Sequence, residues 1–250
     1  MSRYISSDWH GQIALANQIM DFLKPEDKLY FLGDAADRGP AGYEIIKMLL
    51  SDNRVIYLLG NHEDMLIKCV PEFLKGNFYY RSWWGERNGG KDTWDEIKEL
   101  SPSAALSLVD TLSKLPKRVD LINERGQNLI LTHAGTDPDK DERYWTARGI
   151  KDPYLWNRKH IYYPWSGDDN TYVIHGHTVV EYIPNLENLF EEEEKEIPYI
   201  PTVKFYCSGH KIDVDMGSFY TGVAALFNLD TFETIYFKTK PVGKWAENNK

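Results

Sequence analysis

Side chains that can bind metal ions recur between residues 8 and 177, each time directly after a short apolar stretch. Six of them form the candidate ligand set, which consists of Asp8, His10, Asp34, Asn61, His133 and His177. The set offers only carboxylate, imidazole and amide donors, a combination that suits borderline or hard divalent metals such as Mn²⁺, Fe²⁺ or Zn²⁺. An Asp-x-His pair at the end of a strand is common by itself, so the prediction of a metal site depends on the co-occurrence of all six positions.

Alternating strands and helices must bring these positions together. Apolar stretches predict strands at 4–6, 29–32 and 55–59, and apolar residues at helical spacing predict helices at 13–23 and 42–50. Each of the three strands runs directly into a polar cluster. A strand–helix–strand–helix–strand order is typical of α/β architecture, in which ligands gather at the carboxyl ends of the strands. The first third of the chain therefore predicts an α/β fold with a site at these strand ends.

The rest of the chain adds a helical insertion and further strands. Residues 64–116 are predicted to be mainly helical, apart from an aromatic, glycine-bearing break, and to form a cap-like insertion. Strands are predicted beyond it at 119–122, 129–132, 172–174, 212–214, 223–229 and 234–237. The last two have the spacing of a hairpin, which indicates a mixed sheet. No repeat or linker interrupts residues 1–250, so we expect a single domain, with the acidic run Glu191–Glu194 in a solvated loop.

The amino-acid composition limits the classes of partner that the protein is expected to bind. The formal net charge is −9 and no Lys/Arg-rich stripe offsets it, which argues against nucleic acid as a partner. The apolar runs are strand-sized and the N-terminus has no apolar stretch, so neither a membrane span nor a signal peptide is expected. The two cysteines, Cys69 and Cys207, stand outside any CxxC pattern, which disfavours disulfide or cysteine–zinc chemistry. We expect a monomeric, cytoplasmic protein.

The polar clusters occur in an order that resembles the motifs of a known enzyme family. They are Asp8-x-His10-Gly11, Gly33-Asp34-x-x-Asp37-Arg38-Gly39, Gly60-Asn61-His62-Glu63, His133-Ala134-Gly135 and Gly176-His177-Thr178. These clusters resemble the five motifs of the phosphoprotein phosphatase family of calcineurin-like metallophosphoesterases. The bacterial and phage lambda-type Ser/Thr protein phosphatases are the most similar branch. Two more segments resemble that branch, Asn88-Gly89-Gly90-x-x-Thr93 and Ile212-Asp213-x-Asp215-x-Gly217.

The resemblance implies a fold and a metal centre. The fold would be a β-sandwich of mixed sheets flanked by helices, with the helical insertion within it. Asp34 would bridge two divalent metal ions, for which Mn²⁺ is expected and Fe²⁺ or Zn²⁺ are alternatives. The remaining ligands would divide into Asp8 and His10 for one metal, and Asn61, His133 and His177 for the other. A hydroxide between the metals would attack the phosphorus of a phosphate monoester, such as phosphoserine or phosphothreonine in a protein.

The resemblance also assigns residues that act on the substrate. His62 would diverge from the metals and serve as the general acid that protonates the leaving oxygen. Asp37 would orient His62 and keep it protonated, although a helix or turn cap is an alternative role for Asp37. Arg38 and a second arginine would bind phosphate oxygens. Arg158 is preferred to Arg148 for that second position, because bacterial members of the family resemble the Leu-Trp-x-Arg sequence that ends at Arg158.

Three functions remain open on the sequence alone. The first is hydrolysis of a phosphate monoester, in a phosphoprotein or in a small phosphoester. The second is hydrolysis of dinucleoside polyphosphates such as diadenosine tetraphosphate, because enzymes of that class share these motifs. The third is a catalytically silent binding module, which we disfavour because neither a ligand nor His62 is missing. His175 precedes the last motif and is expected to be a packed strand residue and not a ligand.

Overall fold

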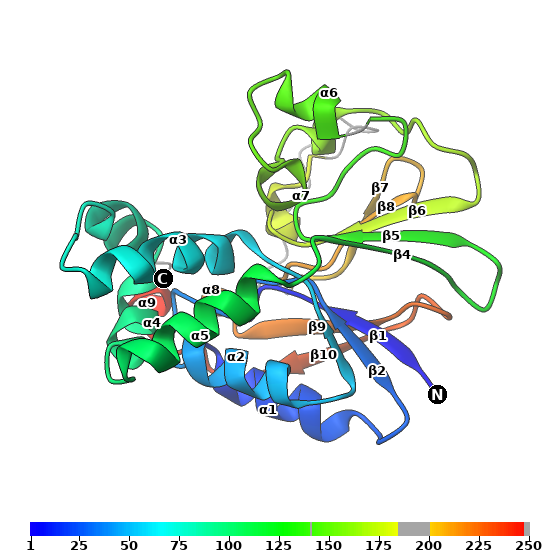
Figure 1. Ribbon diagram of the computed structural model, residues 1–250. Helices are drawn as coiled ribbons and strands as arrows, with labels where there is room; N and C mark the ends of the chain where they lie inside the picture. Colours follow the sequence, from blue (N-terminus) through cyan, green and yellow to red (C-terminus); the bar gives the residue numbers. More distant parts are fainter. Residues whose placement is uncertain (141, 185–200, 248–250) are drawn as a thin grey trace.

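Two five-stranded sheets, packed face to face, form the body of the protein in the computed structural model (Figure 1). The structure describes residues 1–140, 142–184 and 201–247. The acidic run that was predicted to form a loop, Glu191–Glu194, lies outside the described residues. Helices flank the sandwich, and both sheets mix parallel and antiparallel strands. The predicted α/β class and the mixed-sheet sandwich are therefore confirmed.

The first sheet is built from strands near the two ends of the chain, in the order β10-β9-β1-β2-β3. Its strands are Arg3–Ser6 (β1), Lys28–Phe31 (β2), Val55–Tyr57 (β3), Val223–Asn228 (β9) and Thr234–Lys238 (β10). β1, β2 and β3 run parallel, while β9 is antiparallel to both of its neighbours. Parallel neighbours need a crossover, which the helices α1 (Ile13–Phe22) and α2 (Gly42–Ser51) provide. The sequence predicts the elements of this βαβαβ segment to within two residues.

The second sheet repeats this mixture, in the order β4-β5-β6-β8-β7. Its strands are Arg118–Ile122 (β4), Asn128–Thr132 (β5), Thr171–His175 (β6), Lys204–Tyr206 (β7) and Lys211–Asp213 (β8). β5, β6 and β8 are parallel, and β4 and β7 are antiparallel edge strands. The sequence does not predict β7, because three residues at a sheet edge are too few to show a period of two.

The connections of the second sheet carry short elements that the sequence does not predict. Between β5 and β6 lie α6 (Glu142–Thr146), α7 (Pro153–Trp156) and the 3₁₀ turn η2 (His160–Tyr162). Further along the chain are η3 (Val180–Tyr182), α8 (Ser218–Thr221) and α9 (Lys244–Glu247). All are much shorter than the window of residues over which a helical period can be recognised.

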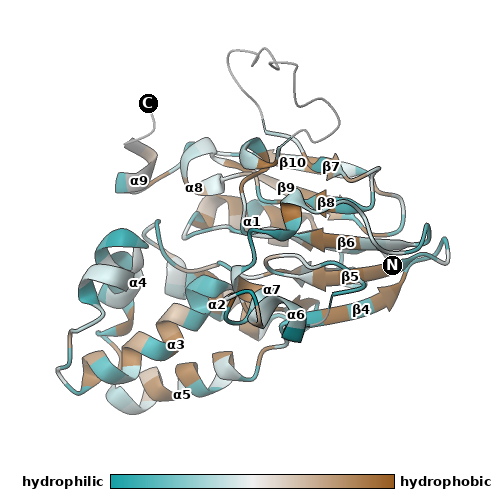
Figure 2. Cartoon of the chain, turned by 90° about the horizontal axis from the view of Figure 1, so that it is seen from above, coloured by the Kyte–Doolittle hydropathy of each residue, from teal (hydrophilic) through white to brown (hydrophobic). Residues whose placement is uncertain are grey.

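Apolar side chains from both sheets meet between them. The buried cluster at this interface comprises Ile5, Leu32, Leu58, Leu129, Leu131, Ile174, Ile212, Val214, Phe227 and Leu229. Burying one such side chain fully contributes roughly 1.5–3 kcal/mol. The middle residues of β5 and β6 are apolar (Figure 2), as expected for parallel strands that are covered on both faces. This packing fixes the strand ends of one sheet relative to those of the other.

The helical insertion packs beside the helices of the first sheet. It comprises α3 (Asn61–Leu74), the π-helical segment η1 (Arg81–Arg87), α4 (Gly90–Ile97) and α5 (Pro102–Ser113). Its buried side chains, Trp84 and Leu112 among them, share one hydrophobic cluster with α1 and α2. The insertion therefore extends the core on the outer face of the first sheet.

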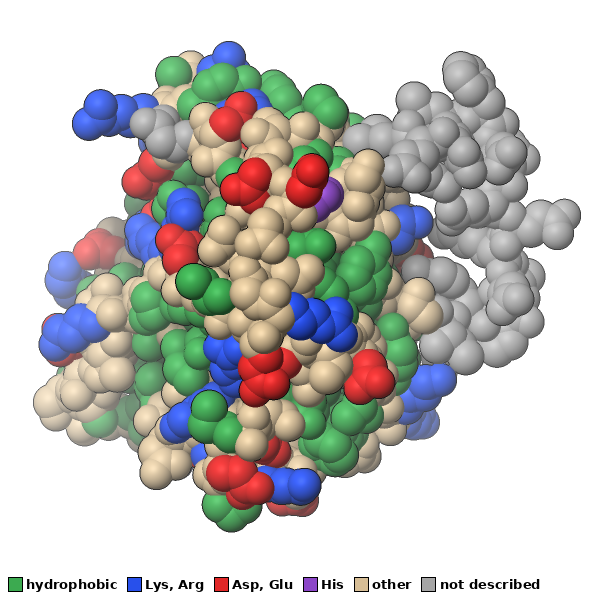
Figure 3. All heavy atoms as spheres, turned by 90° about the vertical axis from the view of Figure 1, so that its right-hand side faces the viewer, with side chains coloured by type: hydrophobic (Ala, Val, Ile, Leu, Met, Phe, Trp, Pro, Cys, Tyr) green, Lys and Arg blue, Asp and Glu red, His purple; other side chains and the backbone are tan. Residues whose placement is uncertain are grey.

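Charges of both signs are mixed on the face at the right-hand side of Figure 1, as far as the described residues show it in Figure 3. A continuous basic surface of the kind that tracks a nucleic-acid backbone is not seen on this face. Among the residues that the structure describes, no helix is both long enough and apolar enough to cross a membrane.

Candidate active site

All six predicted ligands lie together at the carboxyl ends of the parallel strands. The first sheet supplies Asp8, His10, Asp34 and Asn61, and the second supplies His133 and His177. Every one of them is buried. Contacts cross between the sheets, since the backbone N–H of His177 donates to Oδ2 of Asp8 at 3.1 Å. The site therefore lies where the two sheets meet, and both are needed to form it.

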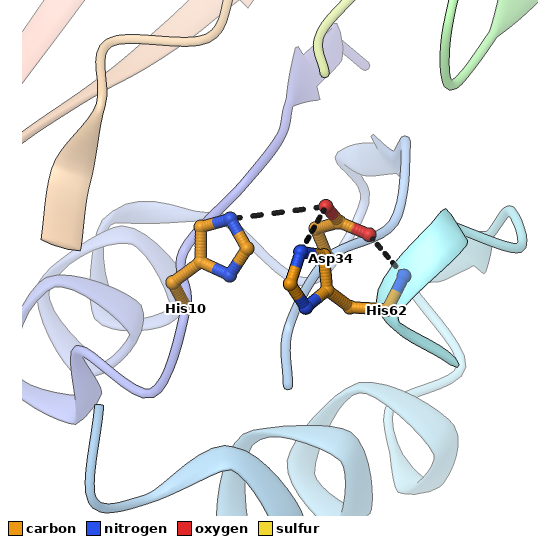
Figure 4. Close-up of side chains that lie close together, drawn as sticks. All are labelled: His10, Asp34 and His62. Atoms are coloured by element: carbon orange, nitrogen blue, oxygen red, sulfur yellow. Dashed lines mark hydrogen bonds and ion pairs between the residues drawn. The ribbon is translucent and has the colours of Figure 1, made fainter. Parts of the chain in front are cut away.

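Asp34 lies beside two imidazole rings, those of His10 and His62, which pack edge-on with their centroids 4.7 Å apart (Figure 4). Its Oδ2 atom is 3.7 Å from Nε2 of His10 and 3.8 Å from Nε2 of His62. The donor atoms of these three side chains all lie within 4.8 Å of one another, close enough to hold one metal ion. Asp8 lies beside them, with Oδ1 3.8 Å from Nε2 of His10. His62 was expected to diverge from the metals, but its ring lies against this group.

Asp34 also belongs to a second group of potential ligands, together with His133 and His177. Its Oδ1 atom is 3.5 Å from Nε2 of His133. Oδ1 of Asn61 lies 2.8 Å from Nε2 of His133 and 2.8 Å from Nδ1 of His177. The two oxygens of Asp34 thus face different groups, as a carboxylate that bridges two cations requires.

Backbone carbonyls determine which imidazole nitrogens face this centre. Nδ1 of His10 lies 2.9 Å from the carbonyl oxygen of Ala36, and Nδ1 of His133 lies 2.9 Å from that of Leu32. A proton held on Nδ1 by such a bond leaves a lone pair on Nε2, which can bind a metal ion or accept a hydrogen bond. In both residues Nε2 is the atom nearer to Asp34.

Burial keeps the imidazole ligands neutral. Desolvation lowers the pKa of His10 and His177 well below the usual value, and it lowers the pKa of His133 to about 3. Neutral imidazole is the form that binds metals. Nε2 of His177 is buried and has no hydrogen-bond partner among the described residues. A buried ring nitrogen without a partner is uncommon, and coordination of a cation would satisfy it.

The carboxylate ligands must be ionised to bind a metal ion, whereas burial favours their protonated form. Burial raises the pKa of Asp8 and Asp34 well above the usual value. Neighbouring carboxylates raise it further, Asp215 for Asp8 and then Asp8 and Glu63 for Asp34. Burying several carboxylates together is costly without positive charge, which divalent cations would supply. The donor set therefore fits the two metal ions that the sequence predicts.

The backbone at the site adopts an uncommon conformation. Positive φ angles, which residues other than glycine rarely adopt, occur at Asp8 (56°), His10 (45°), Asp34 (62°), Asp37 (70°), Arg38 (64°) and His177 (67°). Such conformations cost about 1–3 kcal/mol each and cluster at functional sites. Backbone hydrogen bonds hold them, for example from Asp8 N to Gly33 O at 3.0 Å. Six predicted functional residues thus coincide with strained positions.

His62 and Asp37 form the predicted pair. Nδ1 of His62 donates to Oδ2 of Asp37 at 2.7 Å, and both side chains are fully buried. Burial raises the pKa of Asp37 to about 8. Burial, followed by the charge of Arg38, lowers the pKa of His62. Both pKa shifts favour neutral Asp37 and neutral His62. To keep His62 protonated, as expected from the sequence, Asp37 therefore has to overcome the cost of burying charge.

Arg38 lies at the centre of the site. Its guanidinium donates to Nε2 of His10 at 3.2 Å and to Nε2 of His62 at 3.1 Å. It also lies over the ring of Phe219, 4.5 Å from the ring centroid, and this ring packs edge-on against His10. Phe219 carries no sequence signal for this contact, because nothing in its local pattern links it to a residue 181 positions earlier.

The structure separates the two candidates for the second arginine. Arg158 donates to Oγ1 of Thr178 at 3.1 Å, next to His177, and its positive charge lowers the pKa of His177. Arg148 instead stacks on Tyr144, 3.5 Å from the ring centroid, and donates to the carbonyl oxygen of the same residue. Arg158 is therefore the one that contacts a neighbour of the ligand cluster.

Glu63 holds the loops that carry the ligands. Its carboxylate accepts from the backbone N–H groups of Asp34 at 2.8 Å, Ala35 at 2.9 Å and Gly60 at 3.1 Å. Glu63 thereby joins the end of β2 to the start of α3, where Asn61 and the general acid candidate lie. The sequence pattern includes this residue but does not reveal its role, because the bonds to Asp34 and Ala35 join residues that are far apart in the sequence.

His175 lies outside the ligand groups. It ends β6, is fully buried, and its Nε2 lies 2.6 Å from the hydroxyl of Tyr206. Its ring packs edge-on against that of His160, with the centroids 4.6 Å apart. The prediction of a packed strand residue is therefore confirmed.

Comparisons with known proteins agree with this geometry. A profile of the calcineurin-like phosphoesterase family matches residues 1–213. A Caenorhabditis elegans protein with the provisional name serine/threonine-protein phosphatase is 26% identical over 199 residues, covering 71% of this chain and 53% of that protein. A Bacillus subtilis protein named bis(5'-nucleosyl)-tetraphosphatase (asymmetrical) is 30% identical over 169 residues, covering 61% of this chain and 64% of that protein. The chain thus spans 53% and 64% of the lengths of these two relatives.

A solved structure shows the same fold. The protein serine/threonine phosphatase from Saccharomyces cerevisiae with similarity to human phosphatase PP5 aligns with 98% of this chain, and the alignment covers 83% of that structure. The TM-score is 0.57 at 16% sequence identity, so this likeness supports the fold alone.

Proposed function

The chain belongs to the calcineurin-like phosphoesterases, and on that basis we propose that it is a dinuclear-metal phosphatase acting on phosphate monoesters, chiefly phosphoserine and phosphothreonine in proteins. The observation that carries the proposal is the position of Asp34, which belongs to two groups of potential metal ligands. His62 is a member of one of these groups, and Arg38 donates hydrogen bonds to His10 and His62 in that group. A site that combines two cation positions, a proton donor and a cationic side chain suits phosphoester hydrolysis.

The proposed metals divide the ligands between them. One would be held by Asp8, His10 and Asp34, and the other by Asp34, Asn61, His133 and His177. Mn²⁺ is the expected metal, with Fe²⁺ or Zn²⁺ as alternatives. When bound, two divalent cations supply positive charge for the phosphate and acidify a water molecule so that it can act as the nucleophile.

The protein's own residues would bind the phosphate and protonate the leaving group. Arg38 has a planar fork that can bind two phosphate oxygens. Its move onto a phosphate would release Nε2 of His62, which could then carry a proton. With Nδ1 held by Asp37, His62 would give that proton to the departing oxygen. The alkoxide of serine or threonine is a poor leaving group, so this step matters most for phosphoproteins.

Arg158→Ala is expected to reduce kcat/KM for a phosphopeptide by a factor of roughly tens to hundreds, because a lost charged contact to the transition state costs about 2–4 kcal/mol. Arg148→Ala is the matched control. It should stay within a few-fold of wild type, because Arg148 stacks on Tyr144 away from the ligands. Steady-state kinetics and metal content measured on both variants test this ranking. The reverse order would assign the second phosphate contact to Arg148.

The rival function is hydrolysis of dinucleoside tetraphosphates, the activity named for the Bacillus subtilis relative. Such a substrate needs a surface on which an adenine can stack, and the aromatic pair Trp83 and Trp84 is the obvious candidate. Trp84, however, is fully buried and donates its indole N–H to Asp37. Its ring is thus not available to a base, so of this pair only the half-buried Trp83 could contact one, and a base cannot stack between the two rings.

Substrate preference can be measured directly. We expect kcat/KM for a phosphoserine peptide to exceed that for diadenosine tetraphosphate by about tenfold or more, a difference of about 1.4 kcal/mol in transition-state stabilisation. Both assays use the Mn²⁺-loaded full chain, with the chelated protein as the blank. A clear preference for the dinucleotide would transfer the assignment to the tetraphosphatase class. Binding without turnover of either substrate would instead indicate a silent module.

A further inference from the structure

Three groups from the helical insertion contact the turn that carries Asp37 and Arg38. The indole Nε1 of Trp84 donates to Oδ2 of Asp37 at 2.8 Å. Oγ1 of Thr93 accepts from the backbone N–H of Asp37 at 2.9 Å, and the carbonyl oxygen of Gly89 accepts from the backbone N–H of Arg38 at 3.1 Å. The insertion therefore touches the catalytic turn at both its side chain and its backbone.

The carboxylate of Asp37 depends on Trp84 for its orientation. Oδ2 accepts from both Trp84 and His62, whereas Oδ1 is buried and has no hydrogen-bond partner within the described part of the chain. All side-chain hydrogen bonds of this buried carboxylate thus fall on one oxygen. Without the indole N–H, Oδ2 would keep the contact with His62, and Thr93 would be the remaining insertion side chain beside the carboxylate.

Trp84 itself is held tightly. It is fully buried, its ring centroid lies 5.7 Å from that of Phe73, and it belongs to the π-helical segment η1. π-helical turns are rare and are often found at functional sites. Gly90 leaves room for the indole, because a Cβ atom there would lie 2.2 Å from Nε1 of Trp84. Gly90, the π-helical segment and the burial of the Trp84 ring together orient the indole N–H toward Asp37.

From this geometry we propose that Trp84 is a positioning residue for the general acid, which acts by holding Asp37 against His62. The indole is a donor without acceptor capacity, so it can only present a proton to the carboxylate. The inference rests on the proposed function, because it takes His62 as the proton donor. It gives the insertion a part in leaving-group protonation, in addition to its part in the hydrophobic core.

The test is Trp84→Phe, which removes the N–H and keeps an aromatic ring. Trp83→Phe is the matched control, since Trp83 lies in the same segment, is only half-buried and packs against Tyr80. For Trp84→Phe we expect kcat on a phosphoserine peptide to fall by about 10–100-fold, with KM and metal content unchanged. On 2,4-dinitrophenyl phosphate, whose leaving group needs no proton, the loss should be less than about threefold. Trp83→Phe should match wild type on both substrates.

A second variant perturbs the same contact from the glycine side, and activity on the aryl phosphate together with metal content reports whether each variant is folded. Gly90→Ala keeps the tryptophan but displaces its indole, and it should produce the same loss on the alkyl phosphate alone. Equal losses on both substrates, or no loss in either variant, would overturn the inference. His62→Asn is assayed in parallel. If His62→Asn loses activity mainly on the phosphoserine peptide and Trp84→Phe does not, only the role of Trp84 is refuted. If His62→Asn loses activity equally on both substrates, the assignment of His62 as the general acid is refuted as well.

Discussion

Asp34→Asn should abolish phosphoester hydrolysis, with kcat falling by about 10³-fold or more. Asp34 faces both groups of potential ligands, one with each carboxylate oxygen. An amide is neutral and offers one good oxygen donor, so it should not hold two cations together. Metal ions contribute several kcal/mol of charge stabilisation, and each 1.4 kcal/mol corresponds to about a tenfold change in rate. Turnover at saturating Mn²⁺ and metal content per chain, measured by elemental mass spectrometry, provide the test.

Asp110→Asn is the control for this change, because Asp110 is exposed on α5 and pairs with Lys114. It should retain wild-type turnover and the same metal content. Chelated wild-type protein should be as inactive as Asp34→Asn and should regain activity when Mn²⁺ is returned. Full turnover of the chelated protein, or wild-type turnover of Asp34→Asn, would contradict a dinuclear mechanism.

His62→Asn should separate substrates by their leaving groups. If Nε2 of His62 supplies a proton to the departing oxygen, its loss should slow hydrolysis of a phosphoserine peptide by about 10²–10⁴-fold. An aryl phosphate with an acidic phenol needs little protonation, so its hydrolysis should fall far less. Measuring kcat across a series of phosphates with leaving groups of graded acidity gives the slope that reports proton transfer.

His210→Asn is the matched control for His62→Asn. His210 is half-buried and stacks against Trp165 and Tyr172, at a distance in the fold from Asp34. Its replacement should leave the leaving-group dependence as in wild type. If His62→Asn reduced the rates of alkyl and aryl phosphates by the same factor, His62 would have a binding role or, given its 3.8 Å distance from Asp34, a metal-binding role.

The convergence of the six candidate ligands was predictable because each follows a parallel strand. Asp8, Asp34 and Asn61 come after three strands that are joined by two helices, and the carboxyl ends of such strands meet at one edge. His133 and His177 obey the same rule in the second sheet, whereas the meeting of the two sets depends on how the sheets pack. The second sheet itself was predicted less completely, since β7 and the helices of the β5–β6 crossover are too short to show a period.

The supporting contacts were not predictable in this way. The bond between Trp84 and Asp37 joins residues 47 positions apart, and it depends on the π-helical turn that sets the direction of the indole. The approach of Phe219 to Arg38 depends equally on tertiary packing. Sequence spacing reports which elements end at a site, whereas side-chain orientation across elements is decided by how those elements pack.

The positive φ angles at the site have a consequence for ligand capture. A flexible loop that closes around a cation loses conformational entropy at the moment of binding, and affinity is reduced by that loss. At Asp8, His10, Asp34 and His177, the backbone is already confined to a conformation that these residues seldom adopt. The entropy is therefore lost during folding, when the burial of the sandwich core offsets it. A cation or a phosphate that binds later therefore meets a preorganised site, and its binding costs little further backbone entropy.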